Sequence, residues 1–248
     1  MRPPRFASSP SSDGTSMAID RSRPLLCFVH SASDLGSALG LIERGAAAWG
    51  AADLVQVRGK DLPAGDLEAI VRGWLAAVAA DATRIVVNDR LDVAIATGAH
   101  GVHVGRADLP PEAIRARVPE LLLGMSAHDR AELLEAAAAG ADYAGLGAFY
   151  GSRTKPEAVV LDRSGAGLLE PSPGLRIPVL AIGGITAERI PDVLSVPVVS
   201  GIAVSEAIQG AIDPAEAVAR LRSALDRAWA DLRGPVPDAG AAPVAGST

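Results

Sequence analysis

Polar residues suited to phosphate and metal binding recur where apolar runs end. Glycine-rich turns follow later in the chain, at Gly183-Gly184 and around Val204-Ser205. In a barrel of parallel strands, the C-terminal strand ends meet on one face, and chemistry takes place there. These residues would supply cations, two separated carboxylates, hydroxyls and backbone amides. Such groups predict a site for a phosphorylated substrate and Mg²⁺. The patches are Gln56 to Lys60, Asn88 to Arg90, Asp108, Ser126, and Ser152 to Lys155.

The first patch alternates polar with apolar residues. Gln56, Arg58 and Lys60 are separated by single residues, so they share one face of an extended strand. Arg58 offers a planar donor fork for phosphate, and Lys60 offers a compact charge. A solvated charged loop is the ordinary alternative. Val55 and Val57 alternate with the polar set as a barrel wall would, which favours a site.

Two carboxylates follow neighbouring predicted strands. Asp89 comes directly after the run Ile85-Val86-Val87, and Asp108 follows the next strand. Each could instead cap the helix that begins beside it, because capping is a common role for aspartate. Together they can reach one metal, and oxygen ligands of this kind suit Mg²⁺.

Ser126 and two histidines complete the set of polar candidates. Ser126 ends the fifth strand, where it could donate to a phosphate or cap the following helix. His103 falls inside the fourth strand, so a wall histidine is the expectation. His128 lies at the mouth and is a candidate for proton transfer.

The last three strand ends predict phosphate-holding loops. Small hydroxylated residues beside a lysine, Ser152, Arg153, Thr154 and Lys155, follow the sixth strand, although a surface loop is the plain alternative. Gly184 follows the seventh strand, and Val204-Ser205 ends the eighth. Loops after strands seven and eight form the common phosphate site of α/β barrels. Glycine lets the backbone approach an oxyanion.

Alternating strands and helices must position these residues, and they predict an α/β fold, a single (β/α)8 TIM barrel. No Gly-x-Gly-x-x-Gly fingerprint follows the first strand, which weakens a dinucleotide-binding fold. The expected strands are 25–30, 53–57, 84–87, 101–104, 121–125, 142–147, 178–182 and 197–203. The expected helices are 34–49, 65–80, 90–97, 111–117, 129–139, 164–170, 186–194 and 213–232.

Composition sets the outer limits of this interpretation. Residues 1–23 and 234–248 read as disordered tails around a catalytic domain at 24–233. Apolar residues make up 49%, enough for a large core, whereas the net charge of −6 and 3% aromatic content disfavour nucleic-acid binding. The single cysteine, Cys27, reads as a buried small hydrophobe. With no apolar run of membrane length and no signal core, we expect a cytoplasmic enzyme.

From about residue 25 to 225 the chain resembles thiamine-phosphate synthases. Individually the motifs are modest, but their order and spacing are specific. The family's Gln-Leu-Arg-Glu-Lys appears as Gln56 to Lys60, its Asn-Asp-Arg as Asn88 to Arg90, its Gly-x-His-x-Gly-Gln-x-Asp-Leu-Pro as Gly101 to Pro110, its Thr-x-Thr-Lys as Ser152 to Lys155, and its Ile-Gly-Gly-Ile as Ile182 to Ile185.

The resemblance implies a reaction and a set of roles. Such enzymes join a hydroxymethylpyrimidine diphosphate to a thiazole phosphate, releasing pyrophosphate and forming thiamine phosphate. Asp89 and Asp108 would ligate Mg²⁺, and Gln56 would lie near the pyrimidine ring. The diphosphate would be held by Arg58, Lys60, Asn88, Ser126 and Lys155, with Arg58, Lys60, Ser126 and Lys155 carrying the catalysis. The thiazole phosphate would be held by Ser152, Arg153, Thr154, Gly184, Val204 and Ser205.

Three departures from the family pattern leave alternatives open. Gly59 replaces a glutamate, Arg106 replaces a glutamine and could pair with Asp108, and Gly151-Ser152 replaces a Pro-Thr pair. One alternative is a thiazole tautomerase of the same superfamily, which uses a histidine where His128 stands. Another is a non-catalytic barrel that binds thiamine precursors. The preferred thiazole and the oligomeric state, a homodimer included, are left open.

Overall fold

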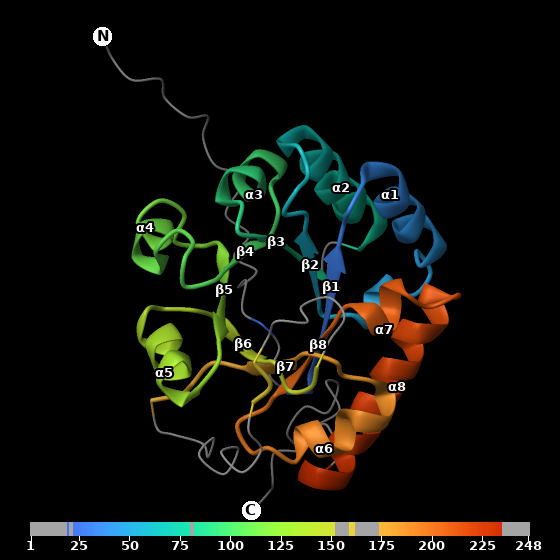
Figure 1. The fold of residues 1–248 in the computed structure, drawn as a ribbon, viewed down its shortest axis with the longest axis vertical. Helices are drawn as coiled ribbons and strands as arrows, with labels where there is room; N and C mark the ends of the chain where they lie inside the picture. Colours follow the sequence, from blue (N-terminus) through green and yellow to red (C-terminus); the bar gives the residue numbers. More distant parts are fainter. Residues whose placement is uncertain (1–18, 20–21, 80–81, 152–158, 162–173, 235–248) are drawn as a thin grey trace, which may run out of the picture.

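Eight parallel strands form a closed barrel in which each strand pairs with its neighbours in sequence and β8 pairs with β1 (Figure 1). The computed structural model describes residues 19, 22–79, 82–151, 159–161 and 174–234. The single (β/α)8 barrel predicted from the sequence is confirmed. The strands are β1 (Leu25–Ser31), β2 (Leu54–Arg58), β3 (Arg84–Asn88), β4 (Gly101–Val104), β5 (Leu122–Ala127), β6 (Tyr143–Gly147), β7 (Val179–Ile182) and β8 (Gly201–Val204).

Helices surround the barrel on its outer side (Figure 1). The predicted helix 164–170 lies outside the described residues. The helices are α1 (Leu35–Arg44), α2 (Ala64–Ala77), α3 (Leu91–Thr97), α4 (Pro111–Arg115), α5 (Arg130–Ala138), α6 (Ile190–Leu194), α7 (Glu206–Gln209) and α8 (Pro214–Arg233), with short 3₁₀ turns at Trp49–Ala51 and Ala187–Arg189.

Several elements differ from the sequence-based expectation, and a tertiary contact explains the largest change. Helix α1 ends at Arg44 because the Trp49 indole folds back and donates to the Ile42 carbonyl at 2.8 Å. A Cβ at Gly45 would lie 2.0 Å from the Trp49 ring, so only glycine fits there. Strand β8 begins at Gly201 instead of residue 197, and the short helix α7 was not expected.

The barrel wall separates two apolar layers. Val55 and Val57 face outward into the large core between strands and helices. The inward-facing residues fill the barrel with a second cluster: Leu25, Cys27, Val29, Leu54, Val86, Leu122, Tyr143, Leu180 and Ala203. Burial raises the pKa of the Cys27 thiol to about 12, so this cysteine is the inert packing residue that the sequence predicts.

A buried ion network closes the N-terminal face of the barrel. The Asp53 carboxylate accepts from the Leu26 amide at 2.7 Å and pairs with Arg23 at 2.5 Å and Arg222 at 3.1 Å. Arg222 also donates to the Pro24 carbonyl at 2.9 Å. The network ties the starts of β1 and β2 to α8.

Candidate active site

Strand register brings polar side chains together directly above the inner core. Gln56 lies two residues beyond Leu54, and Asn88 two residues beyond Val86, so each shares the inward face of its core neighbour. The Gln56 side-chain N–H donates to Asn88 Oδ1 at 2.6 Å. This bond leaves the Asn88 amide nitrogen as a donor and the Gln56 carbonyl oxygen as an acceptor for a bound molecule.

Asp89 has an unusual backbone conformation. Its φ is +64°, and it is the only residue other than glycine with a positive φ in the part of the chain that the structure describes. Aspartate tolerates this region better than most residues, but the conformation still costs free energy. The Asp89 amide donates to the His103 carbonyl at 2.8 Å, which fixes the turn, and the side chain does not cap α3. The strained turn favours the functional role over the capping role.

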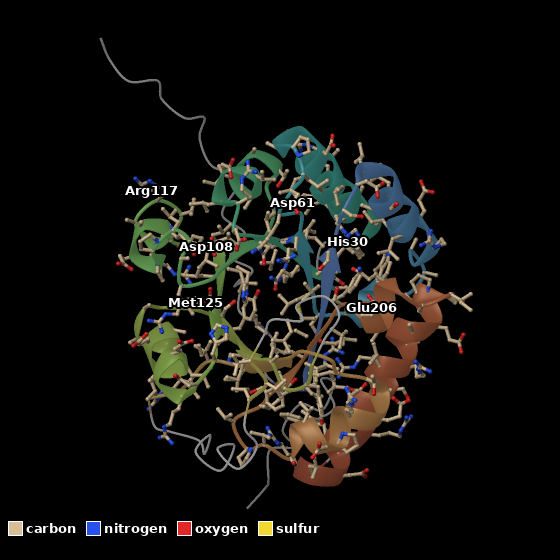
Figure 2. The ribbon with its side chains drawn as sticks, in the orientation of Figure 1. His30, Asp61, Asp108, Arg117, Met125 and Glu206 are labelled. Carbon is tan, nitrogen blue, oxygen red and sulfur yellow. The ribbon has the colours of Figure 1, made fainter. Side chains whose placement is uncertain are left out.

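Asp108 is held beside the end of β4 by its own loop (Figure 2). Its Oδ2 accepts from the Gly105 amide at 2.7 Å. Burial raises the pKa of Asp89, and a hydrogen bond to Asp108 and repulsion from that carboxylate raise it further. The charges of Lys60 and Arg58 oppose this shift. Asp108, Lys60 and Arg58 therefore all lie close enough to act on the Asp89 carboxylate.

This arrangement fits a divalent cation. Two carboxylates that repel each other would both be stabilised by a shared positive ion, and oxygen ligands suit Mg²⁺. Within the described ranges, no group of three or more His, Cys, Asp or Glu side chains gathers in a way that could hold a metal. Two protein carboxylates are nevertheless sufficient when phosphate and water supply the remaining Mg²⁺ ligands.

His103 joins Ser126 to the inner core. Its Nε2 lies 3.0 Å from Ser126 Oγ, and its Nδ1 lies 3.1 Å from the hydroxyl of buried Tyr143. Sequence reasoning placed His103 in the wall but missed Tyr143. The available signal was Gly124 on the strand between them, because the missing side chain leaves room for both rings.

The loop after β7 packs closely against the loop after β6. Gly184 has φ +59°, and a Cβ there would lie 2.5 Å from the Gly151 carbonyl oxygen. Tyr150 anchors the β6 loop: its hydroxyl donates to Asp192 at 2.7 Å, and the Arg189 guanidinium lies 4.3 Å above its ring. Ser152, Arg153, Thr154 and Lys155 continue from this point and lie outside the described residues.

The end of β8 is tied to β1. The Ser205 hydroxyl lies 3.4 Å from Ser31 Oγ and donates to Gln209 Oε1 at 3.2 Å, and Gln209 also accepts from the Ser31 amide. Gln209 was not foreseen, because it belongs to the unexpected helix α7. A small cavity of about 150 Å³ opens beside Ser31, Arg44 and Gln209, at the edge of the mouth and away from the two acids.

Arg106 and His128 both contact Glu132 of α5. Arg106 pairs with Glu132 at 2.6 Å instead of with Asp108, the partner that the sequence had left possible. His128, 64% exposed, also bonds Glu132, with Nδ1 2.9 Å from Oε2. Asp129, which caps α5 by accepting from the Glu132 amide, holds this group at the outer rim.

The fold is an α/β barrel whose mouth places two carboxylates beside cationic side chains. The family sequence model described as thiamine monophosphate synthase matches residues 26–208. Thiamine-phosphate synthase from Anaeromyxobacter dehalogenans is 41% identical over 204 residues, covering 82% of this chain and 90% of the relative. That from Methanoculleus marisnigri is 40% identical over 192 residues, covering 75% and 88%.

A solved structure agrees with these sequences. Thiamine phosphate pyrophosphorylase from Pyrococcus furiosus superposes with a TM-score of 0.68 at 30% identity, covering 84% of this chain and 98% of that one. The chain belongs to the thiamine monophosphate synthase family, and it is a transferase. Among the described residues, no helix combines the length and hydropathy needed to cross a bilayer.

Proposed function

We propose that this chain condenses 4-amino-2-methyl-5-(diphosphooxymethyl)pyrimidine with a thiazole phosphate, yielding thiamine phosphate and pyrophosphate in a Mg²⁺-dependent reaction. One observation carries the proposal: Asp108 lies close enough to hydrogen-bond and repel the Asp89 carboxylate, and the charges of Arg58 and Lys60 act on the same carboxylate. Family membership supplies the substrate class, and the names of the relatives favour the synthase over the tautomerase.

The residues of the mouth suit a dissociative alkyl transfer. The bond between the pyrimidine methylene carbon and the diphosphate oxygen breaks, and the leaving group keeps the electron pair. The aminopyrimidine ring stabilises the cationic carbon, and the thiazole nitrogen then forms the new C–N bond. Arg58, Lys60 and Lys155 offset the growing charge on the leaving group, and Asp89 and Asp108 would hold a Mg²⁺ that contributes the same electrostatic stabilisation when bound.

The remaining residues hold the two substrates in line. Gln56, fixed by Asn88, presents its amide beside the pyrimidine ring, and Asn88 and Ser126 supply donors to the diphosphate. The thiazole phosphate is held by Ser152, Arg153, Thr154, Gly184, Val204 and Ser205. Holding both reactants in attack geometry supplies much of the rate enhancement, because the reaction needs no nucleophilic side chain.

A coupled pyrophosphate-release assay tests the proposal. Purified protein is supplied with both substrates, with each substrate alone, and with both after chelation of divalent cations. We expect pyrophosphate and thiamine phosphate in equal amounts, only when both substrates and Mg²⁺ are present. Product formed at the same rate without any divalent cation would refute the metal role of Asp89 and Asp108.

The same assay separates the alternatives. A tautomerase would convert the thiazole phosphate without a pyrimidine diphosphate. A non-catalytic barrel would show ligand-dependent thermal stabilisation and no pyrophosphate. The proposal includes a cytoplasmic location. It also includes assembly as a homodimer, and light scattering of the full chain would test this oligomeric state.

A further inference from the structure

Tyr143, His103 and Ser126 form a hydrogen-bonded row inside the barrel, on three adjacent strands. His103 on β4 is in register with Gly124 on β5, which is in register with Tyr143 on β6. A Cβ at Gly124 would lie 2.3 Å from the Tyr143 ring and 2.4 Å from His103 Nδ1. The glycine therefore allows the two rings to meet. Ser126 lies two residues further along β5, on the same inward face and nearer the mouth.

The direction of each hydrogen bond follows from the burial of Tyr143. Tyr143 is 1% exposed, and burial raises the pKa of its hydroxyl well above the usual value, so the O–H stays protonated. Among the described residues, His103 Nδ1 is the hydrogen-bond partner of that hydroxyl. If Nδ1 carried the imidazole proton, the buried Tyr143 O–H would lack an acceptor, which is costly.

With Nδ1 as the acceptor, the proton of the neutral imidazole is on Nε2. Nε2–H then donates to Ser126 Oγ across 3.0 Å. The Ser126 O–H consequently cannot point at His103, and it is directed to another acceptor. In the opposite tautomer Ser126 would donate to Nε2, and its single proton would be lost to a substrate.

We propose that Tyr143 and His103 are positioning residues that fix Ser126 as a hydrogen-bond donor to the departing diphosphate. The proposal rests on the proposed function, and it adds a reason for the buried polar row beneath the mouth. A donor that is oriented before the reaction costs no reorganisation when charge develops on the leaving group.

Nitrogen NMR of the full chain tests the hydrogen-bond direction without any assay of catalysis. Two-bond correlations in the ¹⁵N-labelled protein identify the protonated imidazole nitrogen, and the loss of one set of signals in His103→Gln assigns them. We expect the Nε2–H tautomer in the wild type, and in Tyr143→Phe a downfield shift of the unprotonated Nδ1 resonance, because that nitrogen loses the hydrogen bond it accepts. An Nδ1–H tautomer in the wild type, or an unchanged Nδ1 resonance in Tyr143→Phe, would overturn the proposal.

Kinetics of Tyr143→Phe, Ser126→Ala and the double variant test the consequence. Loss of one oriented hydrogen bond should lower kcat by about tenfold in Tyr143→Phe, with a smaller change in KM for the pyrimidine diphosphate. The double variant should be no slower than Ser126→Ala, because both changes remove the same donor. Additive losses of kcat in the double variant would contradict the proposal that Tyr143 acts through Ser126.

A matched control lies at the other end of the same strand. His100 precedes β4, and its Nδ1 accepts from the Ile85 amide at 2.9 Å, an acceptor that asparagine can imitate. His100→Asn should keep the wild-type kcat. A tenfold loss of kcat in this control would show that the kinetics report a general disturbance of β4. That result would overturn the kinetic evidence for the proposal. A wild type that releases no pyrophosphate would refute the proposed function, while the tautomer measurement would still decide the hydrogen-bond direction.

Discussion

At the scale of single residues, Asp89 combines backbone strain with an unfavourable carboxylate. Its φ of +64° and its raised pKa both lower the stability of the metal-free fold. Strain and like-charge repulsion at one position are characteristic of binding sites, because a ligand recovers what the empty site loses. Activity and stability should therefore respond to substitution of this residue in opposite directions.

Asp89→Asn tests this trade-off, since asparagine also tolerates positive φ. A folded-state pKa raised above the unfolded value means that ionisation destabilises the fold. This cost is absent below the unfolded pKa, grows as the pH rises from the unfolded to the folded pKa, and is fully present above the folded pKa. At neutral pH we expect Asp89→Asn to raise the melting temperature of the metal-free protein. We expect the same variant to reduce the rate of condensation by at least about a hundredfold, the usual effect of losing one group that stabilises charge in the transition state.

Asp92→Asn provides the contrast three residues away. A hydrogen bond from Arg90 lowers the pKa of the exposed Asp92, so its ionised form stabilises the fold. Its substitution should lower the melting temperature slightly at neutral pH and leave turnover unchanged. Mg²⁺ should raise the melting temperature of the wild type and of Asp92→Asn but not of Asp89→Asn. An equal Mg²⁺ response in all three proteins would contradict the assigned ligand.

At the scale of elements, the loops after β6 and β7 work as one packed unit. Gly184 lets the two backbones approach, and Tyr150 fixes the first loop against Arg189 and Asp192. The residues proposed to hold the thiazole phosphate follow directly from this contact. A side chain at Gly184 would prevent this close approach to the Gly151 carbonyl oxygen.

Gly184→Ala and Gly98→Ala separate backbone strain from contact. Both glycines have positive φ, +59° and +72°, so each alanine should cost about 1–2 kcal/mol of unfolding free energy. Only at Gly184 would the new Cβ meet another backbone, since nothing lies within 4 Å at Gly98. We expect both variants to lose stability in urea titrations but only Gly184→Ala to show a raised KM for the thiazole phosphate. Indistinguishable kinetics would show that the contact does not position that subsite.

At the scale of the whole molecule, stability and chemistry occupy opposite faces of the barrel. Arg222 belongs to the closing network with Asp53, far from the acid pair at the mouth. Arg222→Ala leaves a buried carboxylate short of a partner and should cost about 3–5 kcal/mol of unfolding free energy. Its kcat and KM should stay at wild-type values at temperatures where it remains folded.

Arg227→Ala is the matched control on the same helix. Arg227 is exposed and bonds only Ser223 among the described residues, so its loss should change stability by less than about 0.5 kcal/mol. If Arg222→Ala lowered kcat in the folded protein, the separation of the two faces would be contradicted.

The sequence predicts the barrel well because buried parallel strands are short continuous apolar runs, as in Ile85-Val86-Val87. It predicts less well where tertiary contacts decide a boundary, as at Gly45, where Trp49 ends α1. The acid pair could be predicted because strand ends converge on one face. The contact between His103 and Tyr143 was harder to predict, because Gly124 indicates room for the two rings only once the register between the strands is known.

The way β1 and α8 meet has a practical consequence. Pro24, just before β1, accepts from Arg222, and Arg233 at the end of α8 donates to the Pro197 and Val199 carbonyls before β8. The polypeptide thus enters and leaves the barrel on the side away from the substrates. A reporter domain fused directly before residue 22 or directly after Gly234 should leave substrate access undisturbed.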